Sequence, residues 1–79
     1  MPHFYFHVHN SIEVEDEVGV EHANLDAAVT SGIIDARHLM SDEIKSVGRI
    51  CLSHYIEICD ASGIQMHIVR YGDCVEILP

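Results

Sequence analysis

The sequence predicts a two-layer α+β domain in which one long helix covers one face of an antiparallel-rich sheet. Residues 3–9, 52–59 and 64–69 alternate apolar and polar side chains, whereas residues 25–47 repeat apolar side chains every three or four positions. The predicted order is therefore strand, strand, helix, strand, strand. Because the chain has 79 residues, we expect a single domain, residues 1–79, with one thin core.

The first strand is predicted over residues 3–9, where Phe4, Phe6 and Val8 share the face that packs under the helix. The opposite face carries ionisable and aromatic side chains, namely His3, Tyr5, His7 and His9.

Residues 12–20 predict a short, broken second strand with a turn or bulge at residues 16–19. We expect Val18 and Val20 to contact the core. The segment is acidic and contains glycine, which is typical of a solvated sheet edge that resists pairing with another chain. Its acidic residues are Glu13, Glu15, Asp16 and Glu17.

The helix is predicted to begin after Asn24, a favourable N-cap residue, and to end before Gly48, a favourable C-cap residue. A helix of that length spans about 35 Å, whereas the first strand spans about 23 Å. We therefore expect either that the helix overhangs the sheet or that it ends early, near Ser41 and Asp42.

Two further strands are predicted over residues 52–59 and 64–69, joined by a hairpin loop at residues 60–63. The break at residues 71–73 ends the last of them, and residues 74–78 are expected to add an edge segment. Alternation predicts that these residues face inward: Leu52, His54, Ile56, Ile58, Ile64, Met66 and Ile68. The outer face then receives Tyr55, Glu57, Cys59, His67 and Val69.

The chain is strongly acidic, with 13 Asp and Glu against 4 Lys and Arg and a formal charge of −9. We expect no nucleic-acid partner, because phosphate binding requires clustered Lys and Arg. We also expect no membrane partner, because no apolar run reaches the roughly 18 to 20 residues of a membrane span. The first residues do not resemble a signal peptide, and the three cysteines do not form a disulfide framework. We therefore expect a cytoplasmic protein with reduced thiols.

Five short motifs follow one another along the chain. They are Met1-Pro2, Phe4-Tyr5-Phe6-His7-Val8, Glu15-Asp16-Glu17-x-Gly19-Val20-Glu21, Leu25-x-Ala27-Ala28 and Ile56-Glu57-Ile58-x-Asp60-x-x-Gly63. Together they resemble a family of short bacterial proteins, common in alphaproteobacteria, that is described only as a domain of unknown function. The resemblance implies the same order of elements and no established activity. The chain departs from the family pattern at Ser31-Gly32, His3 and His9, so the resemblance supports only His7 on the outer face.

The pair His7-x-His9 is the sharpest candidate site, because residues two apart on a strand project from one face and recur in metal sites. His3, His67 and Glu57 are predicted on the same face. The alternative is a polar face that is solvated or buried in a dimer. No Cys-x-x-Cys or His-Glu-x-x-His motif accompanies the pair, so a metal bound by His7 and His9 is a hypothesis.

No motif predicts an enzyme, and we expect no catalytic residues and no cofactor. Asp35 and His38 are three apart on the helix and are expected to form a surface ion pair, because no nucleophile can be placed beside them.

The sequence predicts a non-enzymatic interaction module that forms a homodimer, because small two-layer domains often cover a semi-apolar face by pairing. Tyr5, Tyr55 and Val69 are expected near the contact. One alternative is an antitoxin-like or regulatory partner of a basic protein, since the hairpin, the helix opening and the acidity are similar to the partial RNase-H-fold antitoxins. Another alternative is the metal-binding protein that uses His7 and His9.

Overall fold

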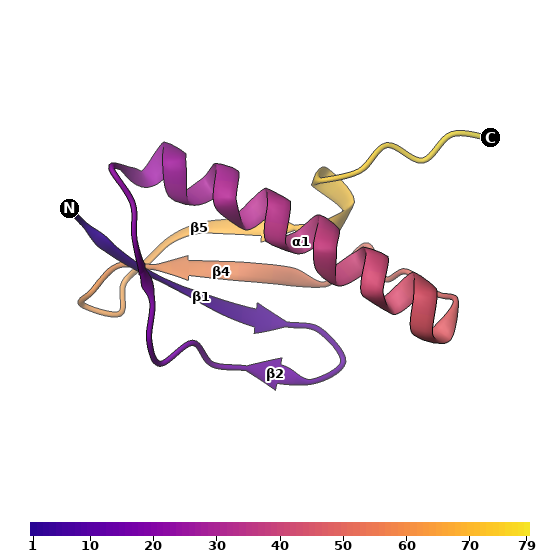
Figure 1. The fold of residues 1–79 in the computed structure, drawn as a ribbon, viewed down its shortest axis with the longest axis horizontal. Helices are drawn as coiled ribbons and strands as arrows, with labels where there is room; N and C mark the ends of the chain where they lie inside the picture. Colours follow the sequence, from indigo (N-terminus) through magenta and orange to yellow (C-terminus); the bar gives the residue numbers. More distant parts are fainter.

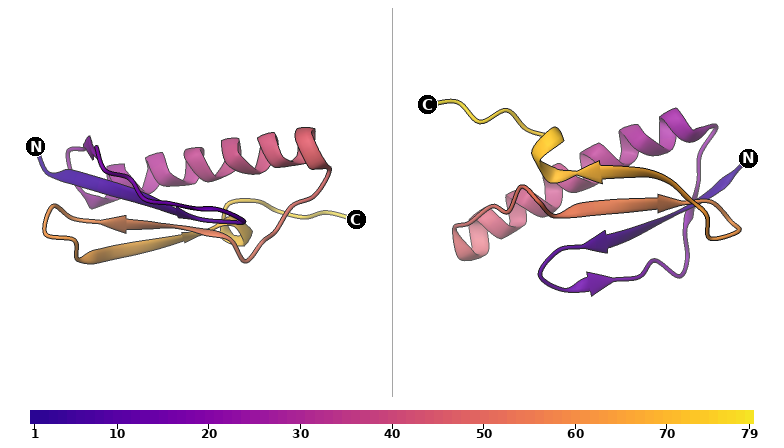
Figure 2. Two further views of the ribbon diagram at one scale, coloured as in Figure 1. Left: turned by 90° about the horizontal axis from the view of Figure 1, so that it is seen from below. Right: turned by 180° about the vertical axis from the view of Figure 1, so that it is seen from behind.

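The computed structural model describes residues 1–79 and contains a helical layer and a sheet layer (Figures 1 and 2). The elements are β1 (His3–His9), β2 (Glu13–Val14), β3 (Val20–Glu21), α1 (Leu25–Val47), β4 (Tyr55–Cys59), β5 (Gln65–Arg70) and a 3-10 turn (Tyr71–Asp73). This arrangement confirms the predicted α+β class. Although α1 has 23 residues, it is not apolar enough to cross a membrane.

The sheet is antiparallel and has the strand order β2-β1-β4-β5, with β3 paired to the other end of β1. The strands β2 and β3 are therefore two parts of one edge, interrupted at residues 15–19, as the broken-strand prediction required. The prediction that Val18 and Val20 contact the core is wrong, because both side chains are exposed. Neither β2 nor β3 is among the main contacts of α1, which are with β4, β5 and the 3-10 turn.

The helix has the predicted ends. The Asn24 side chain accepts a hydrogen bond from the Ala27 N–H at 2.8 Å, and Gly48 closes the helix in the left-handed conformation with φ 71°. The alternative prediction, that the helix ends early near Ser41 and Asp42, is therefore wrong. The last turns of α1 overhang the sheet (Figure 1).

The core lies between β4, β5 and a stripe of small residues on α1. The helix buries Ala28, Gly32, Ala36 and Met40 on one face. A Cβ added to Gly32 would lie 3.3 Å from side-chain atoms of Ile58 and Val69, so the helix backbone approaches the sheet closely there. Ile56 and Ile58 are fully buried as predicted.

The first strand is less well covered than predicted. Phe4 is buried, but Phe6 and Val8 are only half-buried, although both pack against the core. Tyr5 and Phe6 project from opposite faces of the sheet, because they are adjacent in β1. The cause is the position of α1, which contacts mainly β4 and β5.

The inward face predicted for the last strand is wrong. Val69 pairs with Ile56 and lies buried under the helix, whereas Ile68 pairs with Glu57 and faces outward. A bulge causes the difference: Ile58 pairs with His67 and Cys59 with Gln65, so the pairing skips Met66. Consequently His67 lies on the helix side of the edge strand, and Met66 and Ile64 are exposed.

The segments that flank the last two strands also differ from the prediction. The strand predicted from residue 52 begins at Tyr55, and Leu52 is exposed. His54 is half-buried and packs edge-on against Tyr71 at a ring distance of 5.7 Å. Residues 74–78 form no strand; instead the Arg37 Nε–H donates to the Cys74 carbonyl at 2.8 Å and ties the C-terminal segment to α1.

The burial pattern predicts a large difference between two isoleucines. Ile56→Ala should lower the free energy of unfolding by about 3 kcal/mol, because it leaves a cavity at a fully buried site. The matched control Ile64→Ala should change it by less than about 0.5 kcal/mol, because that side chain is exposed. Urea denaturation of the three proteins measures both values, and equal losses would contradict the assigned strand faces.

Candidate functional site

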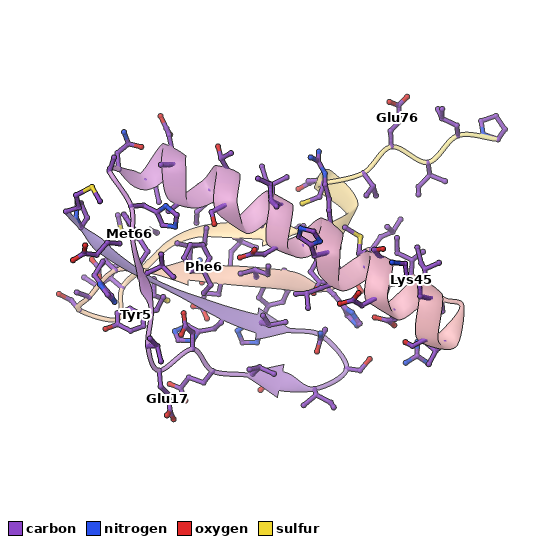
Figure 3. The ribbon with its side chains drawn as sticks, in the orientation of Figure 1. Tyr5, Phe6, Glu17, Lys45, Met66 and Glu76 are labelled. Atoms are coloured by element: carbon purple, nitrogen blue, oxygen red, sulfur yellow. The ribbon has the colours of Figure 1, made fainter.

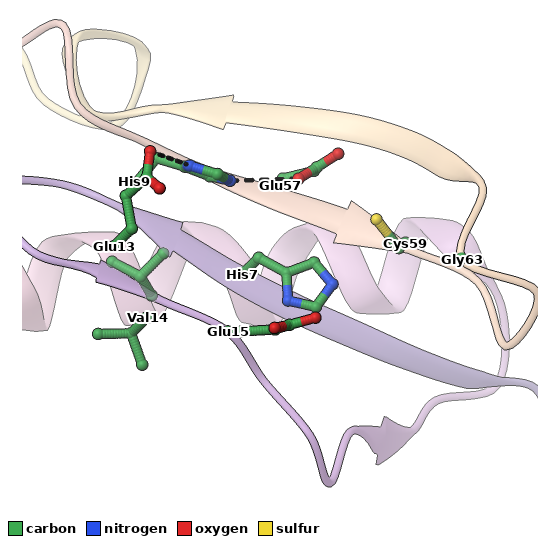
Figure 4. Close-up of a pocket in the computed structure, with 9 residues that line it drawn as sticks. His7, His9, Glu13, Val14, Glu15, Glu57, Cys59 and Gly63 are labelled. Atoms are coloured by element: carbon green, nitrogen blue, oxygen red, sulfur yellow. Dashed lines mark hydrogen bonds and ion pairs between the residues drawn. The ribbon is translucent and has the colours of Figure 1, made fainter.

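The sheet face that points away from α1 carries the ionisable side chains of β1 and β4. His9 lies opposite Tyr55, His7 opposite Glu57, and Tyr5 opposite Cys59, so all six project from this outer face. An open groove of about 430 Å³ runs across it (Figure 4). Its polar lining consists of His7, His9, Glu13, Glu15, Glu57 and Cys59, with no Lys or Arg.

His9 bridges two strands within this groove. Its Nδ1 lies 3.4 Å from the Glu13 Oε1 and its Nε2 lies 3.2 Å from the Glu57 Oε1. Its ring also stacks on Tyr55 at a centroid distance of 4.6 Å. A protonated imidazole would therefore form ion pairs with carboxylates of β2 and β4 at once, and its position is set by three neighbours.

His7 is held differently, by the backbone at the start of the interrupted edge. The Asp16 N–H donates to the His7 Nδ1 at 3.0 Å, so a neutral His7 carries its proton on Nε2. Figure 4 shows the ring beside Glu15, between the His9 bridge and Cys59. His7 and His9 thus share a face, but they contact different partners.

Asp16 organises the interruption between β2 and β3. Its carboxylate accepts hydrogen bonds from the N–H groups of Phe6 at 3.1 Å, Val18 at 3.0 Å and Gly19 at 2.9 Å. Burial alone would raise the pKa of Asp16, but these hydrogen bonds and the nearby His7 outweigh burial and lower it. The ionised carboxylate therefore stabilises the fold.

This role was not predicted from the sequence, where Asp16 was interpreted as one of four solvated acids. The available signal was the motif Asp-x-x-Gly, in which the aspartate accepts from the N–H two residues on and glycine takes a positive φ. The hairpin at Asp60 repeats it: the Asp60 Oδ1 accepts from Ser62, and Gly63 has φ 84°. At Gly19, φ is 70° and an added Cβ would lie 2.8 Å from the Phe4 carbonyl oxygen.

The prediction that His3, His67 and Glu57 lie on the same face as His7 and His9 is only partly correct. His7, His9 and Glu57 meet at the groove, but His3 Nε2 contacts the Val18 carbonyl at 2.8 Å, near the other end of β1. His67 lies on the helix side. No group of three or more His, Cys, Asp or Glu side chains has a geometry that could hold a metal ion. Metal binding by His7 and His9 stays a prediction that only a binding measurement can test.

The remaining candidate groups lie apart from the groove. Asp35 and His38 lie on α1 and form no ion pair with each other. All three cysteines are free thiols. Hydrogen bonding to Ser53 lowers the pKa of the Cys51 thiol, whereas burial raises the pKa values of Cys59 and Cys74.

The fold and groove define a class of small two-layer α+β protein with an acidic, histidine-containing sheet face. Residues 3–72 match the family described as a domain of unknown function, DUF6894, and the chain therefore belongs to this family. The match confirms the resemblance found from the motifs. No curated protein and no solved structure gave a significant match.

Replacing Asp16 should reveal its contribution to the interrupted edge. At pH 7, Asp16→Asn should lower the free energy of unfolding by about 1 to 2 kcal/mol, because the new amide NH₂ would face an N–H donor. Since the pKa of Asp16 is lowered in the folded state, its contribution is complete above the ordinary value near pH 4 and is lost as the pH falls through the folded value.

The measurement is urea denaturation at pH 7 and pH 3, with Glu17→Gln as the control, because Glu17 is an exposed acid beside Asp16. The difference between wild type and Asp16→Asn should shrink at pH 3. A difference that is constant with pH, or one that Glu17→Gln reproduces, would contradict the role of the carboxylate.

The thiols should react at different rates. With Ellman's reagent at neutral pH, the folded protein should show one fast-reacting thiol, because only Cys51 combines partial exposure with a lowered pKa. Cys51→Ser should remove the fast phase and Cys59→Ser should retain it. A fast phase that survives in Cys51→Ser would show that a buried thiol opens readily.

Proposed function

We propose that this chain is a non-enzymatic interaction module that acts as a homodimer in the cytoplasm. One observation carries the proposal: only 11 of 79 residues are buried, while 14 large apolar side chains remain exposed. Such a chain gains stability by association, because a second surface removes apolar area from water without adding to the core. The free state of all three cysteines fits a reducing compartment.

The accessible surface supports the same proposal. The chain exposes 5239 Å², whereas a monomeric protein of 8.8 kDa exposes about 4,800 Å² by the usual scaling with mass. The shape explains the excess, since the molecule measures only 16 Å along its shortest axis. Standard interfaces bury about 800 Å² per partner, so the excess is a substantial part of what one contact removes.

The contact residues expected from the sequence need one correction. Val69 is buried beneath α1 and cannot reach a second molecule. Tyr5 and Tyr55 are half-buried on the outer face, so a second molecule can contact both side chains.

A second candidate function is that of a partner for a basic protein. The observation that favours it is the outer groove, whose charged lining is entirely acidic apart from two histidines, in a chain with a formal charge of −9. Opposite charge accelerates association and selects partners. A lysine-rich peptide should then bind wild type more tightly than Glu13→Gln/Glu15→Gln, and added salt should weaken the binding. Equal binding by both proteins would exclude the groove as the binding site for a basic partner.

The homodimer is tested by light scattering coupled to gel filtration. At tens of micromolar protein, we expect a mass of twice 8.8 kDa, because burial of the exposed apolar side chains outweighs the repulsion between two acidic chains. A mass of 8.8 kDa that is constant up to several hundred micromolar would contradict the proposal.

A further inference from the structure

The helix layer covers only part of the sheet. In Figure 1, α1 lies over β4 and β5, and β1 and β2 lie beside it. Val14 pairs with Val8 and shares its face, yet it is 53% exposed. The inner face of β1 and β2 therefore has an apolar surface with no second helix above it.

A groove follows this uncovered strip along the flank of α1. One hollow of about 270 Å³ is lined by Phe6, Val8, Leu39 and Ile56, with Asp35 and His38 at its rim. A second hollow of about 380 Å³ lies between the β1–β2 turn and the end of the helix, where Ile12, Val14, Val47 and Asp42 contribute to its walls. We call the two together the helix-side groove. The floor of the first hollow is apolar. The walls of the two hollows carry Asp35, Asp42 and the mutually paired Glu43 and Arg49.

The surface of α1 opposite the core complements the helix-side groove in polarity and charge. At 100° per residue, one outer stripe contains Ala27, Ser31, Ile34, His38, Ser41 and Lys45. Ile34 is 47% exposed there, and its neighbours within the stripe, Ser31 and His38, are polar. No acidic residue belongs to this stripe, although the chain has 13. The stripe thus carries one large apolar side chain, Ile34, and two basic side chains, His38 and Lys45.

We propose that the helix-side groove binds the outer stripe of α1 from a second copy of this chain, reciprocally. This inference rests on the proposed homodimer and specifies its interface. A two-fold axis along the helices would place them side by side and parallel between the two sheets, so that each Ile34 faces the partner's apolar floor. Both copies then use the same patch, as a closed symmetric dimer requires.

The charges favour a second copy over an unrelated partner. Asp35 precedes His38 by three residues, and Asp42 precedes Lys45 by three, so the two pairs repeat after seven residues. No ion pair joins either couple within one chain. In parallel, side-by-side helices, each aspartate lies within one turn of the partner's basic residue, as in heptad-based pairing. The aspartates of each chain would thus meet basic side chains of the partner, although each chain is acidic.

Sedimentation equilibrium of the full chain tests the interface. Ile34→Asp should raise the dimer dissociation constant at least tenfold, whereas the matched control Ile64→Asp, an exposed isoleucine in the hairpin loop, should leave it within twofold. Circular dichroism must show both variants folded, which is expected because neither side chain is buried.

A charge exchange keeps the test independent of any apolar effect. Asp42→Lys and Lys45→Glu should each weaken the dimer, and the double variant should recover most of the affinity (Figure 3 shows Lys45 on the helix). Failure of the double variant to recover would overturn the proposed helix pairing.

The outcomes separate this inference from the proposed function. A wild-type chain that is monomeric at all concentrations would overturn both. A wild-type dimer that Ile34→Asp leaves intact would overturn only the helix-side interface. If Tyr55→Ala or Ile68→Lys weakens the dimer instead, the contact lies on the outer face or on the β5 edge, which also overturns this interface.

Discussion

The close approach of α1 to the sheet at Gly32 determines most of the architecture. With alanine at positions 28 and 36 and glycine between them, the helix backbone lies against Ile58 and Val69. A side chain at position 32 would have to displace both. The helix therefore lies over β4 and β5, which seals the core there. It also leaves the inner face of β1 and β2 without cover, because one helix spans only part of a five-stranded sheet.

The other edge depends on a single carboxylate. Asp16 holds the backbone of β1, the turn at Gly19 and, through its own N–H, the ring of His7. This one residue links the edge of the sheet to the groove on its outer face. The acidic edge is thus more than a solvated surface that resists pairing, because one of its acids supports the geometry of the neighbouring ionisable groups.

Features that depend only on neighbouring residues were predicted well from the sequence, and features that depend on strand pairing were not. Asn24 and Gly48 identified both helix ends because capping involves only neighbouring residues. The last strand could not be oriented, since Ile68 and Val69 are both apolar and the bulge at Met66 changes the parity. For the same reason His67 was placed on the wrong face. The outer pair His7 and Glu57 was predicted correctly, because both strands alternate cleanly.

The overhang of α1 has a consequence for the motions of the chain. Ile44 and Val47 are about half exposed, so the final turns are held by the Gly48 N–H bonds to Glu43 and Ile44 and by the Arg49–Glu43 ion pair. Local opening costs less free energy where few apolar contacts must be broken. Amide protons in these turns should therefore exchange with solvent sooner than those near Gly32. The connection to β4 would lengthen transiently with each opening, which makes this end of the molecule the natural point of first proteolytic cleavage.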